Sequence, residues 1–185
     1  MIYRSASDLI AVFPKDDNTK LLIRQAVAML NTASETVETL RVKMNRTASQ
    51  LPEYPVVMEM NGVGPTLGPQ LIAEIGDVTR FEHRGSLTAY AGVDPRPNES
   101  GDYKRQSNPT TKKGSPYLRK TLFQIMDGLI KRSPVDDPVY AFMDKKRAEG
   151  KPYHVYMTAG ANKFLRIYYG RVNTFLSPAA EVEEP

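Results

Sequence analysis

The chain has 185 residues and a formal net charge of +4, and it contains no cysteine. This length can bury one ordinary hydrophobic core and still leave residues for a helical extension. The lack of cysteine excludes disulfides and thiolate metal sites, and it suits a cytoplasmic protein. The two histidines, His83 and His154, each lack a second ligand at metal-binding spacing, so we expect no metal site. Since no secretory signal or membrane-length apolar run occurs, we expect no membrane contact.

A long helix is predicted for residues 18–50, where no proline or glycine interrupts the chain. Either Asp17 or Asn18 is a suitable cap for its start. Apolar or small residues recur at alternating steps of three and four, namely Ile23, Val27, Leu30, Ala33, Val37, Leu40, Met44 and Ala48. This stripe is typical of a coiled-coil seam, although a long helix lying along the domain would show it too. We assign residues 1–50 to a lead-in and this helix, and the coiled-coil interpretation predicts a homo-oligomer, a dimer or larger.

Residues 51–176 are predicted to form a mainly α domain that contains a helix-hairpin-helix unit. The prolines of residues 51–55 break the long helix, residues 56–60 read as a short helix, and a second helix ends at Gly76. The hairpin between them is Gly62-Val63-Gly64, in which the glycines allow a tight turn and a close approach to a partner. Free backbone N–H groups at the start of the second helix would bind a DNA phosphate. A plain helix–helix turn without phosphate contact would use the same glycines.

Two prolines near this hairpin make different demands on the second helix. Pro65 suits the first turn of a helix. Pro69 follows four residues later and would clash with a carbonyl inside a continuous helix. We therefore expect the second helix to start nearer Gly68, after a longer hairpin loop than usual.

Further helices are predicted downstream, each with recognisable end signals. They cover residues 86–91, stopped by Gly92, then 115–131 and 136–150, started by Ser115-Pro116 and Asp136-Asp137-Pro138, and finally 153–175. Residues 93–109 hold three prolines and a polar majority, which predicts a long irregular basic loop or a loose hairpin. Residues 177–185 are expected to form a disordered acidic tail.

Positive charge is concentrated between Arg96 and Lys120. Seven basic residues stand there against Glu99 and Asp102, a local charge of +5 that exceeds the +4 of the whole chain. A surface that follows nucleic-acid phosphates needs such a concentration, although an ordinary solvated face is the alternative. The candidate DNA-binding residues in this stretch are Lys104, Arg105, Lys112, Lys113, Arg119 and Lys120.

A set of motifs occurs in a fixed order along residues 60–175. They are Gly62-Val63-Gly64-Pro65, Leu71-x-Ala73-Glu74-Ile75-Gly76-Asp77, Arg80-Phe81, Leu87-Thr88-Ala89-Tyr90-Ala91-Gly92-Val93-x-Pro95, Ser100-Gly101, Lys113-Gly114-Ser115-x-x-Leu118-Arg119 and Gly150-Lys151-Pro152. Each motif alone is weak, but the ordered set resembles the C-terminal domain of the serine-dependent insertion-sequence transposases. That family comprises bridge-RNA-guided recombinases and also includes the Piv-type DNA invertases.

The resemblance implies a catalytic role for one serine. In that family this domain supplies a serine nucleophile that attacks a DNA phosphodiester, and the motif position falls on Ser100. Ser115 is the second candidate, although its place as a helix N-cap gives it a sufficient structural role. The basic residues would bind phosphates and stabilise charge on the transferred group. Here residues 100–104 read Ser-Gly-Asp-Tyr-Lys, where the family has Ser-Gly-Gly-Lys, so Asp102 places an anion where a cation helps.

The resemblance also implies partners and a missing domain. In the family a RuvC-like nuclease domain with four acidic metal ligands and a coiled coil come first, and nothing before Asp17 can hold that domain. We expect the C-terminal part of a longer protein, with DNA as partner, a structured guide RNA as a second one, and no cofactor of its own because the divalent metal belongs to the nuclease domain. The predicted function is that of a transposase or site-specific recombinase domain. The alternatives are a non-catalytic DNA- or RNA-binding module and a purely structural dimerisation piece.

Overall fold

The computed structural model describes Pro14, residues 16–95 and residues 110–177. The chain forms two compact units, Met1–Lys43 and Met44–Pro185. Throughout the described part the structure is helical, and extended pairing there is limited to one isolated antiparallel bridge between Pro95 and Thr110. The predicted mainly α fold is therefore confirmed. Among the described helices, none is both long and apolar enough to cross a membrane.

The long N-terminal helix is α2, Asp17–Ala48, which confirms the prediction for this stretch. Its cap is Asp16 rather than Asp17 or Asn18, because the Thr19 backbone N–H donates to Asp16 Oδ1 at 2.7 Å. That hydrogen bond holds the pKa of the Asp16 carboxyl below its ordinary value. The larger seam residues are exposed, with 47% to 66% of their surface accessible at Ile23, Val27, Leu30, Val37 and Leu40. From Ile23 to Leu40 the large residues of the stripe therefore have no partner within the described residues, whereas Ala48 at its end is buried.

The two helices around the glycine hairpin are α3, Tyr54–Met58, and α4, Leu67–Ile75. The first of them starts two residues earlier than predicted, with a proline in its opening turn. The start of α4 lies one residue before the expected Gly68, and Pro69 is its third residue, where a nitrogen needs no helical acceptor. Pro65 precedes the N-cap residue Thr66, so it lies in the hairpin loop rather than in the first turn that would suit it.

The remaining elements are the short 3-10 turn η1, Val78–Arg80, and the helices α5, Arg84–Ala91, α6, Pro116–Arg132, α7, Pro138–Ala148, and α8, Tyr153–Leu176. The predicted cap Ser115 accepts a backbone N–H of α6, and of the two aspartates predicted to start α7 it is Asp137 that accepts backbone N–H groups of that helix. Gly92 ends α5 with a φ of +66°, as its position predicted. That helix begins earlier than expected because the His83 ring nitrogen Nδ1 accepts from two N–H groups of its first turn.

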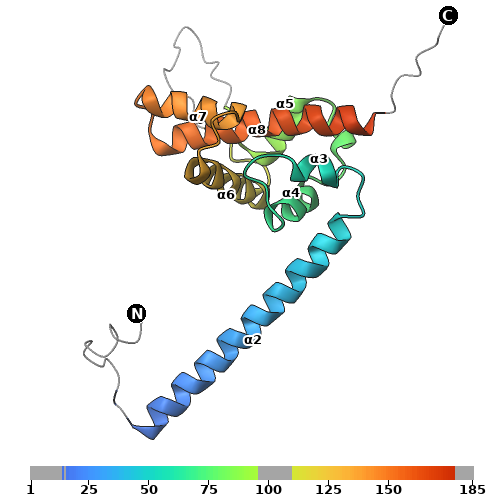
Figure 1. The fold of residues 1–185 in the computed structure, drawn as a ribbon. Coiled ribbons are helices and arrows are strands. Elements are labelled where there is room, and N and C mark those ends of the chain that lie inside the picture. The colour runs from blue at the N-terminus through green and yellow to red at the C-terminus, as the bar shows by residue number, and fades with distance from the viewer. Residues whose placement is uncertain (1–13, 15, 96–109, 178–185) are drawn as a thin grey trace, which may run out of the picture. The chain divides into compact units, whose positions relative to one another are not determined.

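The core of the second unit is organised around α8, which contacts α3, α5, α6 and α7 (Figure 1). With 24 residues and about 1.5 Å of rise per residue, this helix is long enough to pass all four. Its buried residues recur at helical spacing and form one stripe, namely Met157, Ala161, Phe164, Leu165, Tyr168 and Val172. On α6 a second buried stripe packs against both α4 and α8. This packing fixes the elements that carry the candidate site.

Candidate nucleic-acid interface

The first glycine of the hairpin is held against a helix of the core. Gly62 has a φ of +81°, a region that residues with a Cβ rarely adopt. A Cβ added there would lie 2.9 Å from the Ile125 carbonyl oxygen and 2.9 Å from Leu129 Cγ, both on α6. Val63 is buried, whereas Gly64 has no atom within 4 Å of an added Cβ. Of the three predicted hairpin contacts, only Gly64 borders open space.

The start of α4 offers few backbone donors to an anion. The Gly68 N–H already donates to the Gly64 carbonyl at 2.8 Å, and Pro69 has no N–H. Two of the residues in the first turn therefore have no N–H to offer a ligand. An anion site that relies on several converging N–H groups is therefore weaker here than the sequence predicted.

The ends of α5 and α6 meet at a tight junction. The Ser115 N–H donates to the Tyr90 carbonyl at 2.6 Å, and an added Cβ on Gly114 would overlap that carbonyl. Next to this junction, Thr111 is bonded to Asp94 twice, by its N–H to the carbonyl at 3.1 Å and by its hydroxyl to Oδ1 at 2.6 Å. The chain before residue 96 and the chain after residue 109 are thereby held together. Three predicted site residues, Ser100, Lys104 and Arg105, lie outside the described residues.

The other candidate nucleophile, Ser115, is engaged in structural hydrogen bonds. Its Oγ accepts from the Leu118 N–H at 3.1 Å and donates to Glu74 Oε2 at 3.4 Å. The residue is half-buried at the first turn of α6. These contacts satisfy the role of N-cap that the sequence predicted, and they occupy the hydroxyl that a nucleophile would need.

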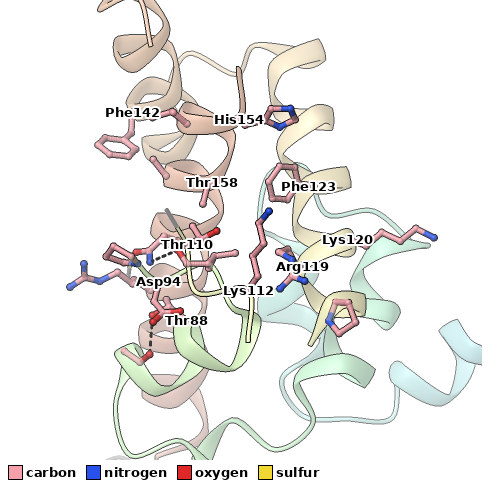
Figure 2. Close-up of a pocket in the computed structure, with 18 residues that line it drawn as sticks. Thr88, Asp94, Thr110, Lys112, Arg119, Lys120, Phe123, Phe142, His154 and Thr158 are labelled. Carbon is pink, nitrogen blue, oxygen red and sulfur yellow. Dashed lines mark hydrogen bonds between the residues drawn. The ribbon is translucent and has the colours of Figure 1, made fainter. Parts of the chain in front are cut away.

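A groove of about 1120 Å³ opens beside the junction, between α5, α6, α7 and α8 (Figure 2). Its charged lining consists of Lys112, Arg119, Lys120 and Arg166 against Asp94, which is four minus one, or +3. The Lys112 side chain reaches into the groove toward Phe123 in Figure 2, while Lys120 extends away from it. Positive charge that gathers in a hollow of this kind raises the local concentration of anions.

Three predicted bases thus come together at this groove, and each has a distinct setting. Lys112 has a φ of +53°, and its N–H donates to the Gly92 carbonyl at 3.3 Å. Arg119 is half-buried, and its Nη1 donates to the Ala91 carbonyl at 3.0 Å, so it supports the end of α5 as well as lining the groove. Lys120 is exposed. The fourth described base, Lys113, is exposed but does not line the groove.

The wall of the groove that α8 forms was not predicted from the sequence. His154, Thr158, Asn162 and Arg166 follow one another at steps of four along α8, so they share one face of that helix. Phe123 of α6 and Phe142 of α7 add aromatic surface. The spacing of four residues is visible in the sequence and places these side chains on one helix face. The sequence does not show that this face lies across the groove from Lys112 and Arg119.

A second hollow of about 470 Å³ has a different character. It lies within the second unit, between the end of α2, the start of α4 and Leu176. Its lining is mostly apolar, and its charged members are Glu53 and Asp77. Because both are acidic, this hollow does not suit a phosphate.

Several residues of the ordered motifs have a structural role. The Arg80 guanidinium lies over the rings of Phe81 and Tyr90, at 4.5 and 4.7 Å from their centroids, and Nη2 donates to the Ile75 carbonyl at 3.0 Å. These contacts join the end of α4 to α5. Such cation–π pairs contribute about 0.5–1 kcal/mol each at exposed sites.

The fold and site define a small helical domain with a cationic groove next to a tight glycine junction. Comparison with known protein families gives a match for part of this domain. Residues 54–141 match the family described as Transposase IS116/IS110/IS902. The matched range runs from α3 into α7 and includes the whole basic run, which is the stretch from Arg96 to Lys120.

A curated relative supports the same family. The chain is 37% identical over 46 residues to a protein of Streptomyces clavuligerus described as "Insertion element IS116 uncharacterized 44.8 kDa protein". This match covers 25% of the chain and 12% of the relative's length. The chain therefore spans only a small part of that relative.

Proposed function

We propose that this chain acts in DNA transposition as the C-terminal, DNA-binding part of a transposase. The observation that carries the proposal is the match of residues 54–141 to a transposase family, because that range contains the junction, the basic run and most of the groove. The cationic lining of the groove supports DNA as the partner. A structured guide RNA is the second partner implied by the resemblance to the bridge-RNA-guided enzymes.

In the proposed reaction Ser100 is the nucleophile. Its Oγ attacks a backbone phosphorus and a P–O(serine) bond forms. One P–O bond of the strand breaks, and the proton of the serine hydroxyl ends on the leaving oxygen, so the leaving strand ends in a hydroxyl. Rejoining reverses these steps on a new strand end. The bases at the groove, Lys112, Arg119 and Lys120, together with Lys113, hold phosphates and stabilise the negative charge on the transferred group. Gly64 is the hairpin residue with room for an approaching phosphate backbone.

The proposed oligomer uses α2. Its exposed seam residues would be buried against a second copy, and each large apolar side chain that becomes buried contributes about 1.5–3 kcal/mol. Four hydroxyls beside the middle of the seam donate to carbonyls four residues earlier, so these donors are already satisfied within the helix. Replacing Leu30 and Leu40 with aspartate should dissociate the oligomer in analytical ultracentrifugation. An unchanged mass would contradict pairing through α2.

The catalytic proposal is tested by covalent adduct formation. The protein is mixed with a labelled, nicked DNA junction, with and without a separately supplied nuclease domain of a full-length relative, and adducts are scored on a denaturing gel. We expect an adduct that is lost in Ser100→Ala and retained in Ser115→Ala. Loss in Ser115→Ala alone would move the nucleophile to Ser115. No adduct in any arm would refute the catalytic part of the proposal.

A non-catalytic DNA- or RNA-binding module is the second candidate. The observation that favours it is the lining of the groove by lysine and arginine side chains, because these can bind phosphates without any reaction at Ser100. This alternative predicts salt-dependent binding without an adduct. Replacing Lys112 and Lys113 with glutamine would then lower the slope of log affinity against log salt by about 2 on duplex DNA.

A further inference from the structure

We infer that the groove between α5, α6, α7 and α8 binds an unpaired nucleotide of a nucleic-acid strand, with its phosphate on Lys112 and Arg119 and its base against Phe123. The inference rests on the proposed function and names the form of the substrate at this site. It predicts that the DNA at the groove is locally unpaired rather than an intact duplex.

The two facing helices supply different chemistry for the two parts of a nucleotide. On α6, Arg119 and Phe123 are one turn apart and both line the groove, so a guanidinium and an aromatic ring lie on the same face. Lys112 extends between them and α8 in Figure 2. A cation next to an aromatic surface matches the phosphate and the base of a single nucleotide.

The face of α8 across the groove adds polar groups to the lining. The Thr158 side chain points into the groove in Figure 2. Asn162 donates its Nδ2 to the Val93 carbonyl at 3.4 Å, which leaves its Oδ1 as an acceptor for a base edge. At the end of this face Arg166 is exposed and can contact a second phosphate.

The apolar part of the lining distinguishes an unpaired strand from a duplex. Apolar surface faces the same space as the lysine and arginine side chains, and it comes from Phe123, Phe142, Val155 and Ala159. A duplex stacks its base faces inward and presents phosphates outward, so it would use the cations and leave this surface without a partner. Unpaired bases expose their faces and stack on aromatic side chains. At about 1120 Å³ the space is also larger than most small-molecule pockets.

The charges of the groove are available for a ligand. Among the described residues, Lys112, Arg119, Lys120 and Arg166 form no ion pair with an acidic side chain. The acidic residue of the lining, Asp94, accepts the hydroxyl hydrogen bond of Thr111 instead. The positive φ of Lys112 is a strained conformation for a residue with a Cβ, and the surrounding junction maintains it. The fold therefore fixes the backbone from which the Lys112 side chain extends into the groove.

The test compares a short single strand carrying one 2-aminopurine with the same strand annealed to its complement. Binding is followed by anisotropy and by 2-aminopurine fluorescence, on the wild-type chain and on four variants. Phe123→Leu keeps an apolar side chain but removes the ring, and Arg166→Gln removes an exposed charge. Their matched controls are Phe175→Leu and Arg132→Gln, which change an exposed ring and an exposed base outside the groove. Thermal melts confirm that each variant is folded.

We expect the single strand to bind more tightly than the duplex. Phe123→Leu should weaken single-strand binding about 5- to 100-fold and abolish the fluorescence change, and Phe175→Leu should do neither. Arg166→Gln should lower the salt slope on the single strand by about 0.7, and it remains informative if Phe123→Leu is unstable. Equal losses in groove and control variants, or equal losses on both DNA forms, would overturn the inference. Tight duplex binding without single-strand binding would overturn it while leaving the proposed function standing, whereas single-strand binding without any Ser100-dependent adduct would refute the catalytic proposal alone.

Discussion

The hairpin glycines have two physical explanations, and one pair of substitutions separates them. Gly62 combines a φ of +81° with a position where an added Cβ would meet the Ile125 carbonyl and the Leu129 side chain on α6. Gly64 has an ordinary φ and open space around it. If packing against α6 determines the shape of the hairpin, Gly62→Ala should destabilise the fold and Gly64→Ala should not.

The magnitude for Gly62→Ala follows from two costs and one gain. A left-handed backbone at a residue with a Cβ costs about 1–2 kcal/mol, and forcing a methyl group into occupied space costs about 1–3 kcal/mol. The Ile125 carbonyl belongs to the backbone of α6, so it cannot move aside cheaply. The lower entropy of the unfolded alanine chain returns about 0.4–1 kcal/mol. A net loss of about 3 kcal/mol remains, which is a large share of the 5–15 kcal/mol typical of a domain.

Urea and thermal unfolding measure this loss directly. For a unit of this size, about 3 kcal/mol corresponds to a fall in Tm of roughly 10 °C. Gly64→Ala should leave the free energy of unfolding within about 0.5 kcal/mol of the wild type. DNA binding by Gly64→Ala then reports on phosphate contact alone, because its fold is intact. A Gly62→Ala variant as stable as the wild type would refute the packing argument.

Three further predictions concern the caps and one buried tyrosine. Ser115→Ala should cost about 1 kcal/mol in urea unfolding, because the Leu118 N–H loses its acceptor, and a larger loss than about 2 kcal/mol would point to a further role for the hydroxyl. Asp137 is buried and accepts from two N–H groups at 2.8 Å, so Asp137→Ala should cost about 2 kcal/mol and Asp137→Asn clearly less; equal costs would contradict the capping role. Burial raises the pKa of Tyr168 above its ordinary value. Since the unfolded tyrosine ionises near pH 10 and the folded one stays protonated, stability should fall as pH rises above about 10, and a Tyr168→Phe variant with an equally steep fall would refute this explanation.

The local chemistry of the chain was sufficient to predict most helix ends. Ser115-Pro116, Asp136-Asp137-Pro138 and Gly92 act through hydrogen bonds and backbone angles within a few residues, and each starts or ends a helix as predicted. The cap of α5 was missed because a histidine ring rarely replaces Ser, Thr, Asp or Asn as an N-cap acceptor. The helix α4 starts one residue before the expected Gly68, because Pro69 is tolerated in a first turn, where its missing N–H has no cost.

The groove could not be predicted from the sequence because its walls come from distant parts of the chain. Lys112 and Arg119 belong to the basic stretch from Arg96 to Lys120. Arg166 lies on α8, and the sequence predicted a helix there but no site residue. Periodicity places Thr158 and Arg166 on one face of α8, but it does not say which helix that face meets. Tertiary packing of α8 against α5, α6 and α7 supplies that information.

The residues of the ordered motifs divide into two groups by what they contact. Gly62, Arg80 and Gly114 are held against backbone or aromatic groups of the same domain, so substitutions there should act mainly on the free energy of unfolding. Arg119 has both kinds of contact, because its Nη1 donates to the Ala91 carbonyl while the residue also lines the groove. Loss of DNA binding in an Arg119 variant would therefore not by itself identify a DNA contact. Variants of Arg166, an exposed residue of the same groove, separate binding from folding more cleanly, because its side chain forms no ion pair among the described residues.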